Sequence, residues 1–402
     1  MPPSGERRRR PRTCPRLGYR AGVDLALPPD DDPRRIRIRR WIAEHPAPTG
    51  RVLAEAGYVA PHWPRPWGLE ADPISQLVVD EELRSAGISR PDNRIGIGWA
   101  GPAIIHAGTE SQKDRYLFPL LAGEEIWCQL FSEPDAGSDL ASLTTRAMRD
   151  GGDYVVNGGK IWTSGAHGSR FGILLARTDP GAPKSKGISY FICPMDAPGV
   201  TVTAVRDMTG AHLFNQVFLD EVRLPAANLV GEENRGWALA KVTLANERVS
   251  LSSSGVLWGA GPSVGDLVDL VRSSGGISDA VARQRLAAAY SEGRILDALR
   301  LRTLSTVARG GTPGVEASVT KALSDRHGQI VTNLAKDLAG ASGMLVGGAG
   351  PVAPGAGTEV TVAAGVWAGA FLFSPALTIG GGTAEVQRDI IAERALGLPR
   401  DR

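Results

Sequence analysis

Eight residues of one stretch, from Ser132 to Asp139, combine polar side chains with a backbone that cannot follow a regular element. The run reads SEPDAGSD, and its proline, its glycine and its short polar residues interrupt both helices and strands. Backbone N–H groups and serine hydroxyls in such a loop can converge on anionic oxygens without bringing in a full charge. The loop therefore suits a pyrophosphate or the electron-rich edge of a ring, with an ordinary acidic surface turn as the alternative.

Two further stretches carry residue types that suit a flat ligand or an anion. The run NGGKIWTS, which begins at Asn157, places Trp162 and Ser164 close together. An indole buries a large area when it stacks, in a ligand site or equally in a core or an interface. Near the C-terminus, GGGTAEVQ at 380–387 stands directly before a predicted helix, whose free N–H groups favour an anion.

Together, the three stretches resemble the motifs of the acyl-CoA dehydrogenase family. The family patterns [ST]-E-P-x-A-G-[ST]-D, N-G-x-K-x-W and G-G-T-x-E-V-Q-R match at Ser132, Asn157 and Gly381, in the family's order. The similarity extends from about Asp32 to the end of the chain. It implies FAD as the cofactor, an acyl-CoA as the substrate and an electron-transfer flavoprotein or similar acceptor as a partner. It also implies a homotetramer or homodimer, or else a hetero-oligomer.

The resemblance assigns roles to single positions. Trp162 matches the tryptophan that packs against the flavin, and Ser164 matches a hydroxyl that faces the flavin N5 edge. The other cofactor contacts that it implies are Leu130 through its backbone, Ser132, Gly137, Ser138, Gly340, Thr383 and Glu385. Ser138 would also lie near the incoming thioester. Arg248 matches an arginine near the CoA portion, with a structural salt bridge as the alternative.

One position departs from the family pattern. The family carries a catalytic glutamate directly before the Gly-Thr pair, where this chain has Gly381. The isovaleryl and long-chain branches place the base instead on the first helix of the C-terminal bundle, before an arginine, and Glu247 matches that position. A Glu-Arg pair on a helix is, taken alone, typical of a solvated face. The resemblance thus predicts Glu247 as the base, while the backbone N–H of Gly381 remains to stabilise the thioester oxygen.

The chemistry that follows is an α,β-dehydrogenation. Glu247 would take the α-proton, flavin N5 would take the β-hydride, and the product would be a trans-2-enoyl-CoA. Two alternatives stay open. One is a flavin monooxygenase or oxidase on the same fold, and the other is a non-catalytic partner subunit of a hetero-oligomeric dehydrogenase. The sequence does not choose among branched, long, sterol or aromatic acyl groups.

The periodicity of apolar residues predicts the elements that must position these side chains. Residues 32–125 have the spacing of amphipathic helices, with Thr109 or Ser111 as an N-cap. Residues 126–233 alternate with a period of two, and their links look too short for parallel strands. Residues 234–402 are helical again, with a glycine-rich loop at 346–358. We therefore expect an α+β multidomain chain with an N-terminal helical domain, a middle antiparallel β-sandwich or barrel and a C-terminal four-helix bundle.

Composition excludes several other classes of protein. Among 402 residues, 45 Lys+Arg nearly balance 43 Asp+Glu, which argues against a general nucleic-acid surface. Three scattered cysteines fit neither a disulfide framework nor a zinc site, so we expect no metal and a cytoplasmic location. No apolar run is long enough for a membrane helix. Residues 1–31 are expected to be a disordered basic tail or the product of a wrongly assigned start codon.

Overall fold

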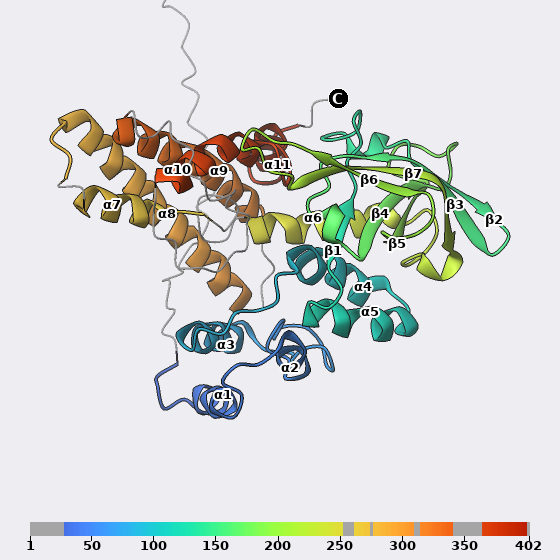
Figure 1. Ribbon diagram of the computed structural model, residues 1–402, viewed down its shortest axis with the longest axis horizontal. Helices are drawn as coiled ribbons and strands as arrows, with labels where there is room; N and C mark the ends of the chain where they lie inside the picture. The colour runs from blue at the N-terminus through green and yellow to red at the C-terminus, as the bar shows by residue number, and fades with distance from the viewer. Residues whose placement is uncertain (1–27, 252–260, 274–275, 309–313, 341–363, 400–402) are drawn as a thin grey trace, which may run out of the picture.

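The computed structural model describes residues 28–251, 261–273, 276–308, 314–340 and 364–399. Helices come first, a curled sheet follows, and helices return at the C-terminal end (Figure 1). This order confirms the predicted fold class. Most of the basic tail and the glycine-rich loop at 346–358 lie outside the described residues.

The N-terminal helices begin at the capping residues that the sequence provides. Of the two candidate N-caps, Thr109 caps the helix and forms a reciprocal capping box with Gln112, whereas Ser111 lies inside the helix. The C-cap is Gly123, whose φ of 72° suits glycine. The elements of this part are α1 (Pro33–Glu44), α2 (Gly50–Glu55), α3 (Pro73–Ser85), the π-helical η1 (Gly96–Ala100), α4 (Gly101–Ala107) and α5 (Glu110–Ala122).

The middle part is one seven-stranded sheet in the order β1-β4-β2-β3-β7-β6, with β5 paired to β4. Its strands are β1 (Trp127–Leu130), β2 (Arg146–Asp150), β3 (Asp153–Lys160), β4 (Phe171–Arg177), β5 (Ile188–Pro194), β6 (Val200–Val205) and β7 (Phe214–Pro225). The short 3₁₀ turns η2 (Leu140–Ser142) and η3 (Ala166–Gly168) lie between strands, and η4 (Ala226–Asn228) lies between β7 and the next helix. Ile173 and Leu175 of β4 join the core shared with the helices, while Leu174 joins the core inside the sheet.

The expectation that no two strands of the sheet are parallel is wrong. Strand β1 pairs with β4 in parallel, from Trp127 opposite Phe171 to Leu130 opposite Leu174, although most other pairs are antiparallel. The short links exclude parallel pairing only between consecutive strands. Residues 131–170, which include β2 and β3, separate β1 from β4 and are long enough to return the chain to the same edge.

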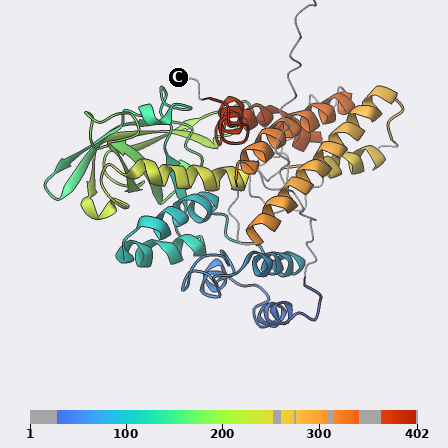
Figure 2. The same ribbon diagram turned by 180° about the vertical axis from the view of Figure 1, so that it is seen from behind.

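The C-terminal part contains the expected long helices α6 (Gly236–Leu251), α8 (Ala280–Ala308), α9 (Glu316–Ala339) and α11 (Ala384–Arg394). The shorter α7 (Val264–Ser273), α10 (Ala364–Phe373) and the 3₁₀ turn η6 (Ser374–Thr378) accompany them. Helix α6 runs between the sheet and the N-terminal helices in both views (Figures 1 and 2), and it contacts η1, α4, β5 and α9. A side chain on α6 can therefore meet residues from every part of the chain.

A buried ion pair joins two loops of the sheet. Lys160, at the end of β3, is fully buried, and its Nζ lies 2.8 Å from Oε1 of Glu133 and 3.0 Å from the carbonyl oxygen of Phe131. The other hydrogen bonds to Glu133 come from the backbone N–H groups of Thr144 and Thr145 and from the hydroxyl of Thr144. A buried charge without such partners would be costly, so the pair ties the loop after β1 to the end of β3.

The pair is ionised at neutral pH. Burial lowers the pKa of Lys160 to about 8, and the negative charge of Glu133 opposes that shift. Burial alone would raise the pKa of Glu133, but the charge of Lys160 and the hydrogen bonds from Lys160, Thr144 and Thr145 outweigh it and hold the pKa at about 2.

We expect Lys160→Met to lower the free energy of unfolding by about 3–5 kcal/mol, because it leaves the Glu133 carboxylate buried without its cation. The double variant Lys160→Met/Glu133→Gln should recover part of that loss, since it removes the uncompensated charge. Lys184→Met is the matched control, because Lys184 and its partner Asp139 are both largely exposed and should contribute little. Urea unfolding of the four proteins measures the effect, and equal losses for both lysine variants would contradict it.

The low pKa of Glu133 predicts a specific loss of stability in acid. A carboxyl whose pKa falls from 4.5 to about 2 on folding stabilises the folded state fully above about pH 4.5, and this stabilisation is lost as the pH falls toward 2. The stability difference between the wild type and Glu133→Gln should therefore shrink across that range. Unfolding free energies measured at a series of pH values test this; a difference independent of pH would show that folding does not lower the pKa of Glu133.

Candidate active site

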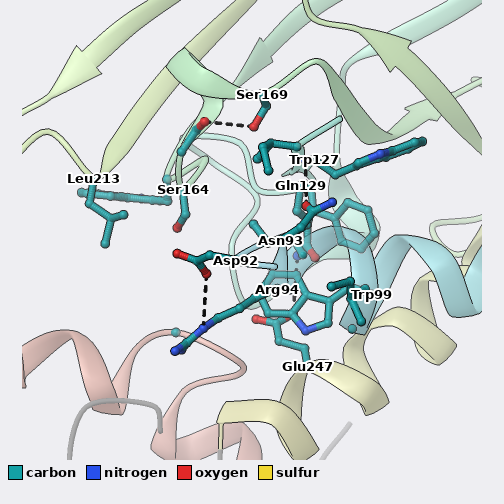
Figure 3. A pocket seen from close by; sticks show the side chains of 18 of the residues that line it. Asp92, Asn93, Arg94, Trp99, Trp127, Gln129, Ser164, Ser169, Leu213 and Glu247 are labelled. Carbon is teal, nitrogen blue, oxygen red and sulfur yellow. Dashed lines mark hydrogen bonds and ion pairs between the residues drawn. The ribbon is translucent and has the colours of Figure 1, made fainter. Parts of the chain in front are cut away.

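A cavity of about 630 Å³ lies where the sheet, the loop before η1 and helix α6 meet (Figure 3). The structure brings several of the predicted site residues to its wall, namely Ser132, Trp162, Ser164, Glu247 and Gly381. They come from the loop after β1, the loop after β3, helix α6 and the loop before α11. Residues far apart in sequence thus line one cavity.

Other predicted site residues do not line this cavity. The side chain of Leu130 is fully buried in the core of the sheet, which leaves its backbone for the predicted contact. Gly340 is the exposed C-cap of α9, and Thr383 caps α11 by accepting a hydrogen bond from the backbone N–H of Val386. The remaining ones, Gly137, Ser138 and Glu385, are exposed. The side chain of Arg248 lies outside what the structure describes.

Trp162 projects from a constrained backbone. Its φ is 62°, which is uncommon for a residue other than glycine, and its side chain is 58% exposed. The indole makes an edge-on contact with Phe214, with ring centroids 5.8 Å apart. The interpretation of Trp162 as a core aromatic is therefore wrong. An exposed indole held in a strained conformation suits an interface or a ligand-binding surface.

The backbone on both sides of Trp162 is held by hydrogen bonds. The N–H of Ile161 donates to the carbonyl oxygen of Ser132 at 2.9 Å, which joins the two loops that reach the cavity. Thr163 exchanges backbone hydrogen bonds with Asn215, whose buried side-chain amide also donates to the Thr163 carbonyl oxygen. These contacts fix the strained residue in place.

Glu247 is only 8% exposed, so the interpretation of the Glu-Arg pair as a solvated face is wrong for this residue. It lies on the cavity side of α6, and its Oε2 is 3.4 Å from Nε2 of Gln129 on β1. Asp92 also lines the cavity, but its side chain is 62% exposed and lies 3.8 Å from Arg94. Of these two carboxylates, Glu247 is the one shielded from water.

The glycine-rich loop before α11 forms another part of the wall. Gly381 and Gly382 have φ values of 67° and 87°, which glycine adopts without strain. The buried side chain of Gln387 donates to the carbonyl oxygens of both residues, each at 3.2 Å. Earlier in the same segment, the buried Lys321 donates to the carbonyl oxygen of Leu377 at 3.3 Å. The loop is thus held from two helices.

Sequence reasoning missed several residues that build the site. Gln129 lies beside a predicted position, but its residue type carries no signal for a site. Gln387 belongs to the matched C-terminal motif, but the resemblance assigns it no role. Asn93 is buried, donates to the carbonyl oxygens of Leu120 and Glu125 and accepts from the backbone N–H of Trp127, so it positions the start of β1. The turn-forming run Pro-Asp-Asn-Arg at 91–94 was the available signal.

Two other kinds of site have no support in the described part of the chain. No group of three or more His, Cys, Asp or Glu side chains there has a metal-binding arrangement, and no helix there is long and apolar enough to cross a membrane. Cys128 and Cys193 are unpaired, and burial raises the pKa of both thiols to about 12, so they are poor nucleophiles. Neither cysteine lines the cavity, whereas the carboxylates of Glu247 and Asp92 do.

Comparisons with known proteins agree with this arrangement along the chain. The N-terminal, middle and C-terminal domain models of acyl-CoA dehydrogenase match residues 33–124, 128–222 and 234–396. Acyl-CoA dehydrogenase FadE34 of Mycobacterium tuberculosis is 40% identical over 387 residues, which are 95% of this chain but 50% of FadE34. Acyl-CoA dehydrogenase IpdE1 of the same organism is 37% identical, over 87% of each chain.

Solved structures show the same similarity. A chain of the ChsE4–ChsE5 complex from Mycobacterium tuberculosis is 31% identical with a TM-score of 0.75, and the match covers 94% of this chain and 100% of that one. A chain of the Tcur3481–Tcur3483 steroid acyl-CoA dehydrogenase is also 31% identical, with a TM-score of 0.73 over 91% of this chain and 97% of the other. The chain therefore belongs to the acyl-CoA dehydrogenase family.

Proposed function

We propose that this protein binds FAD and removes two hydrogens from an acyl-CoA thioester, forming a trans-2-enoyl-CoA, with Glu247 as the base. The observation that carries the proposal is that the buried carboxylate of Glu247 and the backbone of Gly381, in the loop before α11, line the same cavity. The homologous acyl-CoA dehydrogenases support the reaction class, and the cavity supports the assignment of the base.

The residues present fit a flavin. A flat aromatic group needs an accessible aromatic surface and polar groups at its edges, which the exposed indole of Trp162, the Ser132 and Ser164 side chains and the adjoining backbone provide. We propose that these three residues hold the flavin and that the remaining predicted contacts serve the rest of FAD. When bound, the flavin would supply the acceptor for the β-hydride.

The chain's own groups perform the proton transfer. The Cα–H bond of the thioester breaks, an O–H bond forms on Glu247, and the electron pair moves toward the carbonyl oxygen. The proposed role of Gly381 is to donate its backbone N–H to that oxygen as negative charge develops there.

The partners are proposed on separate grounds. Resemblance to the family supports an electron-transfer flavoprotein as the electron acceptor. Similarity to chains of two named two-component enzymes supports a hetero-oligomer beside the homotetramer or homodimer. One of those enzymes is named as a steroid acyl-CoA dehydrogenase, so steroid-bearing thioesters belong in a substrate screen with branched, long-chain and aromatic ones.

An anaerobic titration of the FAD-loaded protein with such thioesters tests the function. We expect one class to bleach the flavin absorbance, and Glu247→Gln to lower the bleaching rate by about 10²- to 10⁴-fold because the base is lost. The matched control is Asp92→Asn, which removes the exposed carboxylate of the same cavity and should leave bleaching intact. Loss of bleaching in Asp92→Asn alone would transfer the role of base to Asp92.

The same titration separates the alternatives. Absence of bleaching by every thioester in an FAD-loaded protein would favour a non-catalytic partner subunit, and adding the candidate second subunit would then be decisive. Rapid reoxidation of the reduced protein by air, with product formed from oxygen, would favour an oxidase or monooxygenase.

Substitution of Trp162 tests its proposed contact with the flavin. Trp162→Gly should reduce the FAD retained per chain, while the stability of the FAD-free chain should change by no more than about 1 kcal/mol. The lost edge contact with Phe214 is offset there by relief of the positive φ. Phe218→Ala is the control, since Phe218 is 43% exposed and does not line the cavity. Retained FAD after gel filtration is the measurement, and equal retention by both variants would exclude the contact.

A further inference from the structure

The side chain of Gln129 has an unusual hydrogen-bonding state beside the proposed base. Its Nε2 lies 3.4 Å from Oε2 of Glu247, whereas its Oε1 is buried and has no hydrogen-bond partner within the described residues. Buried acceptors are normally paired, and an exception in a folded protein often marks a functional group. The distance is long for a hydrogen bond, as is common at catalytic contacts before a substrate binds.

The backbone of Gln129 is placed rigidly. Gln129 lies in β1 opposite Ile173 of β4, and the Asn93 side chain accepts the backbone N–H of Trp127 at the start of the same strand. The contact with Glu247 therefore joins a strand of the sheet to helix α6, across a sequence separation of 118 residues. With the backbone fixed, the amide can still turn about its last side-chain bond.

The two ends of the Gln129 amide match the two protonation states of a carboxyl group. An ionised carboxylate only accepts hydrogen bonds, so it pairs with the Nε2 donor. A protonated carboxyl has an O–H to donate, and it needs an acceptor such as Oε1. A half-turn of the amide exchanges the two atoms, and it breaks no other hydrogen bond of this side chain among the described residues.

We propose that Gln129 is a positioning residue for Glu247 and that its amide turns when the carboxylate takes up the substrate α-proton. This inference rests on the proposed function and adds a residue to it. Before the step, Nε2 donates to the carboxylate and orients it. After the Cα–H bond has broken and the O–H bond has formed, Oε1 accepts from the new carboxylic acid.

Other ionisable groups lie on the cavity wall or on elements packed against α6, and they enter any pH profile. From the loop before η1, the cavity wall includes Arg90, Asp92 and Arg94. The elements packed on α6 add His106 of α4, Tyr190 of β5, which is bonded to Thr243, and the buried pair Lys321–Asp325 of α9. A substitution at Gln129 leaves all of these residues in place. The difference between the pH profiles of variant and wild type therefore reports the effect of the Gln129 amide.

The proposal can be tested by following the exchange of substrate α-hydrogens with solvent. This reaction requires proton abstraction by the base but no hydride transfer. Phenylacetyl-CoA has α-hydrogens but no transferable β-hydrogen, so FAD-loaded protein in D₂O should exchange its α-hydrogens for deuterium, as followed by mass spectrometry. We expect Gln129→Met to slow this exchange by about 10- to 100-fold, because the carboxylate loses the partner that orients it, with little change in thioester binding. The rising limb of its pH profile should move up by about one pH unit, because the ionised carboxylate loses a donor.

Three comparisons make the result decisive. Gln76→Met makes the same change on α3, away from the cavity wall, and should exchange at the wild-type rate. If Gln129→Met does not retain FAD, Gln129→Asn, whose shorter amide withdraws from Glu247, should show the same slowing. Exchange within twofold of the wild type, with an unmoved pH profile, would overturn the role of Gln129 while leaving Glu247 as the base. Wild-type protein that neither exchanges nor is bleached by any thioester would overturn the proposed function as well.

Discussion

The buried ion pair between Lys160 and Glu133 is the contact on which the cavity wall depends. Two charges removed from water are tolerated only while they face each other and their remaining hydrogen bonds are made. Ser132 is next to one partner, and Trp162 lies two residues beyond the other. The loops that carry these side chains cannot separate without leaving a bare charge in the core. Replacing both members of such a pair by apolar residues is often harmless to stability. We therefore regard the positioning of the loop after β1 against the end of β3, rather than a gain in net stability, as the main contribution of this ion pair.

The opposite wall is held by different means. Glu247 is presented by a helix that contacts the sheet, the N-terminal helices and the bundle, so the proposed site forms only when all three parts have assembled. The loop before α11 has glycines at 380–382 and therefore no side chains there that could anchor it. Gln387 donates to the carbonyl oxygens of Gly381 and Gly382, and Lys321 donates to that of Leu377, just before the loop. Catalytic groups need this support, because an error of an ångström in position is costly in rate.

Because position 381 is a glycine, the proposed base is on helix α6 and not at this position. The backbone N–H of Gly381 is still present as the proposed donor to the thioester oxygen. Among the described residues, two carboxylates line the cavity, and their surroundings differ sharply. Asp92 is largely exposed beside Arg94, whereas Glu247 is buried next to an amide that can both donate and accept. Burial excludes water, which strengthens electrostatic interactions at the carboxylate. Exposure therefore distinguishes the two carboxylates, although both are acidic residues at the wall of one cavity.

By itself, the sequence determined the order of helices, strands and helices, the capping of α5 by Thr109 and the motifs that identify the family. These features depend on neighbouring residues, whose spacing is visible in the chain. The same motifs led to Ser132, Trp162, Ser164, Glu247 and Gly381, all of which line one cavity. Only the tertiary structure decided that β1 pairs in parallel with β4, that Trp162 is exposed and that Gln129 meets Glu247. The physical reason is that a local pattern shows which face of an element is apolar but does not specify which distant element covers it. A contact across 118 residues is therefore set by packing alone.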